Sequence, residues 1–121
     1  MPKKKVLIVD DEKDISKNLK EIIEMEGCES FTALTTPEAW DIFQREKPDV
    51  CVIDIHMAYS PYNGIELLRK IREVNKKVKC IILTCVDAGE RGEEAKKIGV
   101  QGYYEKPLGD KFDEFVGKVI E

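Results

Sequence analysis

The sequence predicts an α/β fold: a doubly wound, five-stranded parallel sheet with five helices, forming one domain over residues 1–121. Short apolar runs alternate five times with segments of helical periodicity, which is typical of parallel strands joined by right-handed helical crossovers. The apolar runs are nearly continuous, which indicates strands buried on both faces by helices. A chain of 121 residues is long enough for one domain with a core and too short for two.

Composition and charge exclude several classes of protein. Hydrophobic residues make up 42% of the chain and charged residues 36%, which is ordinary for a globular protein with a charged surface. The net charge of −4 argues against nonspecific binding to nucleic acid. No apolar run is as long as a membrane span, and the basic start leads into a strand without a signal-peptide pattern. We therefore expect a cytoplasmic domain that does not bind membrane or nucleic acid directly.

The four cysteines are predicted to be reduced thiols. None of them forms a C-x-x-C pair, and two lie inside predicted strands. Small buried hydrophobic residues are therefore expected rather than a disulfide or a zinc site. The four are Cys28, Cys51, Cys80 and Cys85.

The first strand is predicted over residues 5–9, and Asp10 and Asp11 follow it directly. The helix after it is indicated by apolar residues at i, i+4, i+7 and i+8 followed by a glycine stop. These positions are Ile15, Leu19, Ile22, Ile23 and Gly27. A short second strand is predicted over residues 30–33.

The second helix is predicted to begin with Thr36 as N-cap and Pro37 at the first helical position. Trp40 and Phe43 then lie on its buried face. The third strand is the apolar run over residues 50–53, which ends in Asp54.

A loop over residues 56–63 follows, and then the third helix begins near Gly64. Its predicted inward residues are Leu67, Leu68, Ile71 and Val74. The fourth strand is predicted over residues 78–83 and ends in Thr84.

The next helix, over residues 88–98, has an apolar face of only Ala88, Ala95 and Ile98, and Gly89 and Gly92 lower its propensity. An element that buries so little is expected to be at the mobile end of the structure.

A short fifth strand is predicted over residues 102–104, with Lys106 and Pro107 after it. Asp110 and Asp113 resemble a capping pair for the last helix. That helix runs to the end of the chain, so no separate output domain is expected in this chain. Its apolar stripe is Phe112, Phe115, Val116 and Val119.

Polar side chains follow four of the five predicted strands. Asp10 and Asp11 follow the first strand, Asp54 the third, Thr84 the fourth and Lys106 the fifth. Each has an ordinary explanation when taken alone, such as helix capping or a turn. The carboxyl ends of parallel strands lie along one edge, where ligands bind in open α/β sheets. The joint occurrence therefore predicts one site.

Three carboxylates in one pocket repel one another, so this site requires a cation. Oxygen ligands favour Mg²⁺, which keeps part of its water shell, over zinc. A carboxylate is a suitable covalent acceptor of a phosphoryl group. If Asp54 attacked phosphorus, Mg²⁺, the Lys106 ammonium and the Thr84 hydroxyl would stabilise the charge on the phosphoryl oxygens.

With these residues in place, the chain resembles the receiver domain of two-component response regulators over essentially its whole length. The matching segments are Val9-Asp10-Asp11-Glu12, Val52-Ile53-Asp54-Ile55-His56-Met57, Asn63-Gly64-Ile65-Glu66-Leu67-Leu68, Leu83-Thr84 and Tyr103-Tyr104-Glu105-Lys106-Pro107. The resemblance implies the flavodoxin-like receiver fold with strand order 2-1-3-4-5.

The resemblance also implies a role for each site residue. Asp54 is implied to be the phosphoacceptor, which takes its phosphoryl group from a histidine kinase or phosphotransfer protein. Asp10 and Asp11 are implied to bind Mg²⁺ together with Asp54 and the backbone carbonyl of His56.

Two further residues are implied to carry the switch. Thr84 is implied to supply the hydroxyl that moves toward the phosphoryl group. Lys106 is implied to form an ion pair with that phosphoryl group. Tyr103 is the aromatic residue whose rotamer reports the change, which is passed to an output domain or target protein.

The chain departs from the family pattern in the loop after Asp54. Ala58 stands where the family usually has proline, and the segment from Tyr59 to Tyr62 makes the loop about two residues longer. One hypothesis is a harmless insertion, whose deletion would leave phosphate lifetime and kinase preference unchanged. The other is that Tyr59 and Tyr62 alter partner contact or phosphate lifetime. Cys85 could also narrow access to Asp54, and the His56 ring is expected to face solvent.

Two alternatives to a phosphoacceptor switch are considered. A haloacid-dehalogenase-like phosphatase also uses an aspartyl phosphate, but it has D-x-D after its first strand and a cap segment, whereas Asp10 and Asp11 are adjacent. A receiver-like interaction domain that takes no phosphate typically lacks one of the acidic residues or the lysine of the site. All of these residues are present here. We expect a signalling domain rather than an enzyme, with at most self-phosphorylation and self-dephosphorylation.

Overall fold

Five parallel strands form a single sheet in the order β2-β1-β3-β4-β5, which confirms the predicted fold and strand order. The structure is a computed structural model that describes residues 3–85 and 89–121. The strands are β1 (Lys5–Val9), β2 (Glu29–Ala33), β3 (Val50–Ile53), β4 (Lys79–Cys85) and β5 (Gly102–Lys106).

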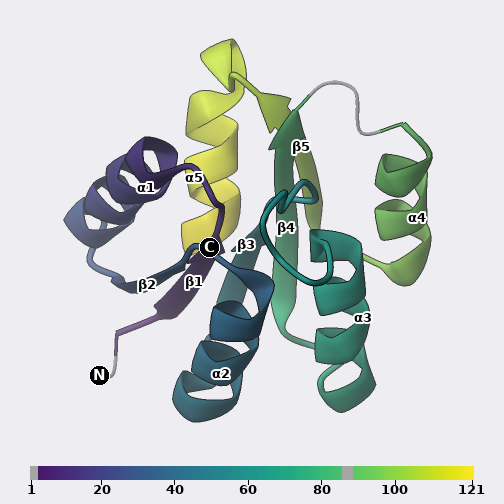
Figure 1. Cartoon of the computed structure of the whole chain (residues 1–121). Coiled ribbons are helices and arrows are strands. Elements are labelled where there is room, and N and C mark those ends of the chain that lie inside the picture. The colour runs from purple at the N-terminus through teal and green to yellow at the C-terminus, as the bar shows by residue number, and fades with distance from the viewer. Residues whose placement is uncertain (1–2, 86–88) are drawn as a thin grey trace.

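Helices cover both faces of this sheet (Figure 1). One face packs against α2 (Thr36–Glu46), α3 (Gly64–Val74) and α4 (Glu90–Ile98). The other packs against α1 (Lys13–Met25) and α5 (Phe112–Ile120), which follows a 3₁₀ turn at Gly109–Lys111. The central strands are therefore buried on both sides, as their continuous apolar runs predicted.

Side-chain alternation divides the core into two layers. Leu7 and Val9 of β1 face α2, α3 and α4, whereas Val6 and Ile8 face α1 and α5. All four are at most 1% exposed. Because successive strand residues point to opposite faces, one apolar strand supplies both layers.

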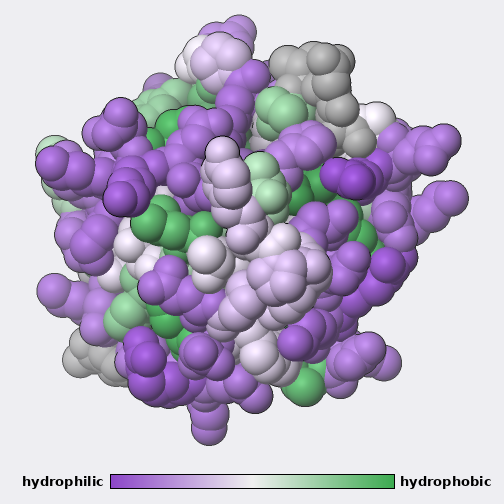
Figure 2. Space-filling view, viewed as in Figure 1, coloured by the Kyte–Doolittle hydropathy of each residue, from purple (hydrophilic) through white to green (hydrophobic). Residues whose placement is uncertain are grey.

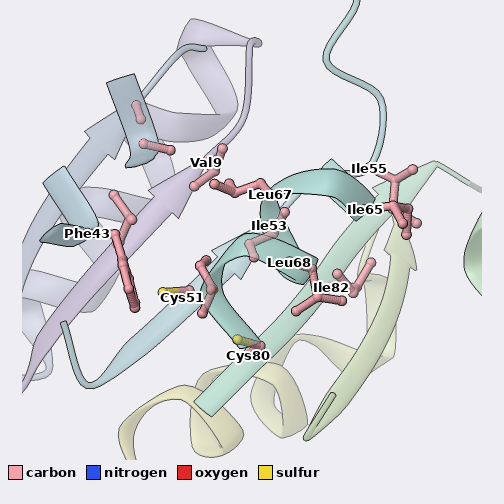
Figure 3. Packing of buried hydrophobic residues seen from close by; sticks show 14 of the residues in the cluster. Val9, Phe43, Cys51, Ile53, Ile55, Ile65, Leu67, Leu68, Cys80 and Ile82 are labelled. Atoms are coloured by element: carbon pink, nitrogen blue, oxygen red, sulfur yellow. The ribbon is translucent and has the colours of Figure 1, made fainter. Parts of the chain in front are cut away.

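The cysteines are free thiols, as predicted. Cys28, Cys51 and Cys80 are buried, as predicted, whereas the predicted burial of Cys85 is wrong: it is the last residue of β4 and is exposed. Cys51 and Cys80 are register partners on β3 and β4 and lie close together beneath α3 (Figure 3).

The predicted N-cap of α2 is wrong by one residue. Thr35 is the N-cap, and its side chain accepts a hydrogen bond from the Glu38 backbone N–H. Thr36 is instead the first helical residue, and its side chain is fully buried. Two consecutive threonines satisfy the same capping pattern, so the sequence did not distinguish them. Trp40 is half-buried and stacks on the buried Phe43 with ring centroids 5.6 Å apart.

Two predicted core positions are exposed. Val74 is 65% exposed and Phe112 is 36% exposed, whereas the other predicted inward residues of α3 and α5 are buried. Val74 is the last residue of α3 and Phe112 the first of α5, so both lie at a helix end. Periodicity gives the side of a helix but not where its contact with the sheet ends.

The predicted capping pair of the last helix is also wrong. Gly109–Lys111 forms a 3₁₀ turn that leads directly into α5, whose N-cap position is Lys111 with no side-chain cap hydrogen bond. A continuous turn carries the chain into the helix, so Asp110 and Asp113 do not form the predicted pair.

The strands β4 and β5 are longer than predicted and include Thr84 and Lys106. The helix α4 begins at Glu90, and the predicted position Ala88 lies outside the described residues. Only Gly92 and Ala95 of α4 are buried, which confirms its sparse apolar face.

The viewed face of the molecule is mainly hydrophilic, with scattered hydrophobic side chains (Figure 2). Among the described residues, no helix has the length and apolar character needed to cross a membrane.

Candidate functional site

The residues predicted to converge do meet at the carboxyl edge of the sheet. The backbone N–H of Asp54 donates to the Val9 carbonyl at 2.9 Å, and that of Asp10 donates to the Ala33 carbonyl at 3.1 Å. Hydrogen bonding thus continues one residue beyond the ends of β1 and β3. This fixes the backbones of Asp10 and Asp54 on neighbouring strands, with their side chains buried.

The first turn of α3 packs directly against the backbone of Asp54. A Cβ atom at Gly64 would lie 2.1 Å from the Asp54 carbonyl oxygen, so this position requires glycine. The Gly64 N–H also donates to the Ile55 carbonyl at 3.0 Å. This role of Gly64 was not predicted, although a glycine directly after the N-cap Asn63 has low helix propensity and was a usable signal in the sequence.

The carboxylate of Asp54 accepts hydrogen bonds from three directions. Its Oδ1 accepts from the Thr84 hydroxyl at 2.8 Å and from the His56 backbone N–H at 3.1 Å. Its Oδ2 accepts from the Lys106 ammonium at 3.1 Å. Thr84 is fully buried and Asp54 is 4% exposed, so these contacts are largely shielded from water.

Lys106 joins the two buried carboxylates of the site. Its Nζ lies 2.7 Å from Asp10 Oδ2 and 3.1 Å from Asp54 Oδ2. Burial lowers the pKa of Lys106, but the hydrogen bond to Asp10 and the charge of Asp54 outweigh burial, so the pKa lies above its ordinary value. Lys106 is therefore held as a cation between Asp10 and Asp54.

Asp10 shows how unfavourable the concentration of negative charge is. Burial raises the pKa of the Asp10 carboxyl group, although hydrogen bonds from Lys106 and from the Glu12 backbone N–H act in the opposite direction. The nearby charge of Asp54 raises it further. A second cation at this site would relieve that cost.

Asp11 completes a cluster that suits a hard cation. It is half-buried, and its Oδ2 accepts from the Ala58 backbone N–H at 3.2 Å. One carboxylate oxygen from each of Asp10, Asp11 and Asp54 lies within 4.8 Å of the others. Opposite ligands of an octahedral Mg²⁺ are about 4.2 Å apart, so small side-chain shifts bring these oxygens into range. The donor set fits Mg²⁺ in chemistry and in spacing.

Two predicted residues lie at the border of the site. The half-buried His56 lines a pocket of about 340 Å³ that Tyr62 and Arg91 also line. Tyr103 of β5 is half-buried against α4. Lys96 Nζ lies 4.7 Å from its ring, and Gly92 lies beside its hydroxyl. Burial, followed by the charge of Glu105, raises the pKa of Tyr103.

The two tyrosines of the longer loop behave differently. Tyr59 is 92% exposed. Tyr62 packs against the core and lies under Lys70, whose Nζ is 4.9 Å from its ring. The sequence could not separate the two, because both are aromatic residues in a loop.

Comparison with known proteins gives a consistent result. The family model of the response regulator receiver domain matches residues 6–118. The chain is 32% identical over 108 residues to sporulation initiation phosphotransferase F of Bacillus subtilis, covering 89% of this chain and 86% of that protein. It is 33% identical over 105 residues to the chemotaxis protein CheY of Halobacterium salinarum, covering 87% and 86%.

Solved structures agree with the sequence comparison. A response regulator receiver domain protein from Clostridium thermocellum has a TM-score of 0.85 and 29% identity, with 97% of this chain and 94% of that chain covered. The response regulator TrrA of Thermotoga maritima, solved in complex with Mg²⁺-BeF, has a TM-score of 0.81 and 32% identity, with 96% and 98% covered.

Some relatives are much longer than this chain. The match spans 38% of the two-component response regulator PprB of Pseudomonas aeruginosa and 44% of the transcriptional regulatory protein CpxR of Escherichia coli. The shared part in each case has the length of the receiver domain. The chain belongs to the response regulator receiver domain family of two-component signal transduction.

Proposed function

We propose that Asp54 is the phosphoacceptor of this receiver domain and that it takes the phosphoryl group of a phosphohistidine on a histidine kinase or phosphotransfer protein. The main support is the set of contacts around its carboxylate. The Thr84 hydroxyl and the Lys106 ammonium both lie within hydrogen-bond distance of Asp54, on opposite oxygens. These are the donors that phosphoryl transfer to this carboxylate requires.

In the proposed reaction, an Asp54 carboxylate oxygen attacks phosphorus and the nitrogen–phosphorus bond of the donor breaks. The electron pair stays on the imidazole nitrogen of the donor, which then takes a proton. The Lys106 ammonium, which contacts the Asp54 carboxylate before the transfer, then contacts the phosphoryl oxygens. The Thr84 hydroxyl donates a hydrogen bond to one of these oxygens. Both residues stabilise charge that develops during the transfer.

Asp10, Asp11, Asp54 and the backbone carbonyl of His56 are proposed to hold Mg²⁺. When bound, the ion neutralises negative charge on the transferring group. The fit of three carboxylate oxygens supports this assignment, as does the Mg²⁺-BeF complex of the similar protein TrrA. Asp10 and Asp11 provide negative charge for the cation. The ion pairs of Lys106 with Asp10 and Asp54 reduce the repulsion between those two carboxylates.

Residues 1–121 are proposed to act as one receiver unit in the cytoplasm, with signalling rather than turnover of a substrate as its output. Thr84 and Tyr103 are proposed to carry the change to an output domain or target protein. Phosphorylation would draw Thr84 away from its present bond to Asp54 Oδ1 and alter the packing between β4, β5 and α4.

Intact-mass analysis after incubation with Mg²⁺ and acetyl phosphate tests the proposal. We expect a gain of one phosphoryl group, which is absent in EDTA and absent in Asp54→Asn. Rapid turnover of a generic phosphate ester, such as para-nitrophenyl phosphate, would favour the phosphatase alternative instead. Lack of any mass gain with both acetyl phosphate and a phosphorylated kinase would favour an interaction domain that takes no phosphate.

A further inference from the structure

The longer loop between β3 and α3, residues 56–63, is fastened to the first turn of α2 (Figure 1). The backbone N–H of Thr36 donates to the Ser60 hydroxyl oxygen at 3.1 Å. The Thr36 hydroxyl donates to the Tyr62 carbonyl at 2.8 Å. Thr36 is fully buried and both hydrogen bonds are partly buried, so the Thr36 end of each bond is shielded from bulk water.

A second contact holds the same end of the loop. Lys70 of α3 places its Nζ 4.9 Å from the Tyr62 ring and 4.8 Å from the Trp40 ring of α2. The ammonium therefore lies between two aromatic rings, an arrangement that stabilises both contacts. The loop is thus packed against α2 and α3 and has a defined position.

The other end of the loop contacts the acidic cluster. The His56 N–H donates to Asp54 Oδ1, and the Ala58 N–H donates to Asp11 Oδ2 at 3.2 Å. Asp11 is the half-buried member of the cluster, so its carboxylate has more freedom than Asp10 or Asp54. A hydrogen bond to one oxygen orients this carboxylate and leaves the other oxygen available.

The residue at position 58 decides whether this bond can form. Proline, which the family usually has there, carries no backbone N–H and could not donate to Asp11. The alanine of this chain can donate, and its N–H lies 3.2 Å from Asp11 Oδ2. One departure from the family pattern, Ala58, therefore contacts an acidic residue of the cluster directly, and the residues of the longer segment contact α2.

We infer that Thr36 and Ala58 are positioning residues for the cation site: Thr36 anchors the loop, and the loop holds the Ala58 N–H against Asp11. This inference rests on the proposed role of Asp11 as a Mg²⁺ ligand. Groups that orient a metal ligand typically change metal affinity by about 10- to 100-fold when they are removed. The affinity for Mg²⁺ thus depends on a buried threonine in α2 that does not contact the acidic cluster.

The test measures the Kd for Mg²⁺ by calorimetry, without a phosphodonor, together with the melting temperature in EDTA. Ala58→Pro removes the N–H donor, and Ala58→Ser is its control because the N–H remains. Thr36→Val removes the hydroxyl at nearly constant volume, and Thr36→Ser restores it. Ser60→Ala removes the acceptor for the Thr36 N–H while changing only one partly buried loop contact.

We expect Ala58→Pro, Thr36→Val and Ser60→Ala each to raise the Kd for Mg²⁺, by about tenfold for Ala58→Pro, and both serine variants to bind as the unaltered protein does. If Thr36→Val does not fold, Ser60→Ala and Ala58→Pro decide the outcome. Unchanged Kd values in those two variants would overturn the inference, even if their melting temperatures fell. Absence of Mg²⁺ binding by the unaltered protein would instead overturn the proposed function.

Discussion

Asp10 shows at the residue scale how a buried carboxylate of the candidate site reduces the stability of the fold. Its pKa is raised above the ordinary value of 3.8, chiefly by burial. Folding therefore favours the protonated form. The stability that Asp10 contributes is fully present below its unfolded pKa and is lost as pH rises through the raised folded pKa. At neutral pH the ionised side chain is a net cost in the metal-free protein.

This cost leads to a prediction for Asp10→Asn. At pH 7 in EDTA, the variant should unfold at a higher urea concentration than the unaltered protein, and the difference should shrink as pH falls through the raised folded pKa toward the ordinary value of 3.8. In the unaltered protein, Mg²⁺ at 100 times its Kd should add about 2.7 kcal/mol of stability, and Asp10→Asn should lose most of that gain. Urea denaturation with and without Mg²⁺ measures both effects. Lower metal-free stability of Asp10→Asn at pH 7 would contradict the account.

The sequence predicted the charged residues of the site better than the residues that support them. Asp10, Asp54 and Lys106 could be identified because each follows a recognisable strand and carries an unusual group for that position. Thr36 could not, because its role depends on contacts across the fold, and Gly64 was marked only by its low helix propensity directly after the N-cap Asn63. Local periodicity does not reveal that Gly64 lies against the Asp54 carbonyl. It also does not reveal that the Thr36 hydroxyl donates to the Tyr62 carbonyl in a distant loop.

At the element scale, α3 is placed by its contact with the strand end that carries Asp54. A Cβ at Gly64 would clash with backbone atoms of Asp54 and Ile55, which cannot move aside as a flexible side chain could. The close approach of α3 therefore determines where Asp54 lies.

We predict that Gly64→Ala lowers the free energy of unfolding by about 1–3 kcal/mol, in the range of other overpacked sites, and reduces phosphorylation of Asp54. Gly117→Ala in α5 is the matched control, because its added methyl group has no neighbour within 4 Å. That variant should gain up to about 1 kcal/mol from helix propensity. Urea denaturation of both proteins makes the comparison. Equal stability of the two variants would exclude a close-packing role for Gly64.

The helix α4 is expected to be the least stable of the helices. It buries only Gly92 and Ala95, and its N-cap Gly89 provides no side-chain cap hydrogen bond. By contrast, α3 buries five residues, including Leu67, Leu68 and Ile71. An element with few buried apolar contacts opens locally more often than its neighbours.

Hydrogen exchange measures this difference directly. Backbone amides of α4 should exchange faster than those of α3 at neutral pH, and phosphorylation should change protection in α4 more than in α1. Equal protection of α3 and α4 in the unphosphorylated protein would argue against α4 as the responsive element.

Element types were predictable from the sequence, whereas several element ends were not. Alternating apolar runs and amphipathic spacing identified the strands and helices. The N-cap at Thr35 was not distinguished from the adjacent Thr36, and the exposure of Val74 and Phe112 depended on where packing ends along each helix. That boundary is set by packing between elements and is not encoded in the spacing within one element.

At the scale of the whole molecule, the strand order explains why the site forms between β1 and β3. These strands are neighbours in the sheet although α1, β2 and α2 separate them in the chain. Connections from β1 and β3 leave toward opposite faces, which opens a crevice at their carboxyl ends. Asp10, Asp11 and Asp54 lie at that crevice. Alternation alone predicted a parallel sheet, while the order of its strands came from the family resemblance.

The central claim is that Asp54 carries the phosphoryl group, and reductive trapping tests it most directly. After incubation with Mg²⁺ and acetyl phosphate, borohydride reduces an acyl phosphate to an alcohol, which peptide mass spectrometry can locate. The account predicts that the reduced side chain is found at position 54 and nowhere else, and that no reduction occurs without Mg²⁺. Reduction at Asp10 or Asp11, or a phosphoryl group on Asp54→Asn, would contradict it.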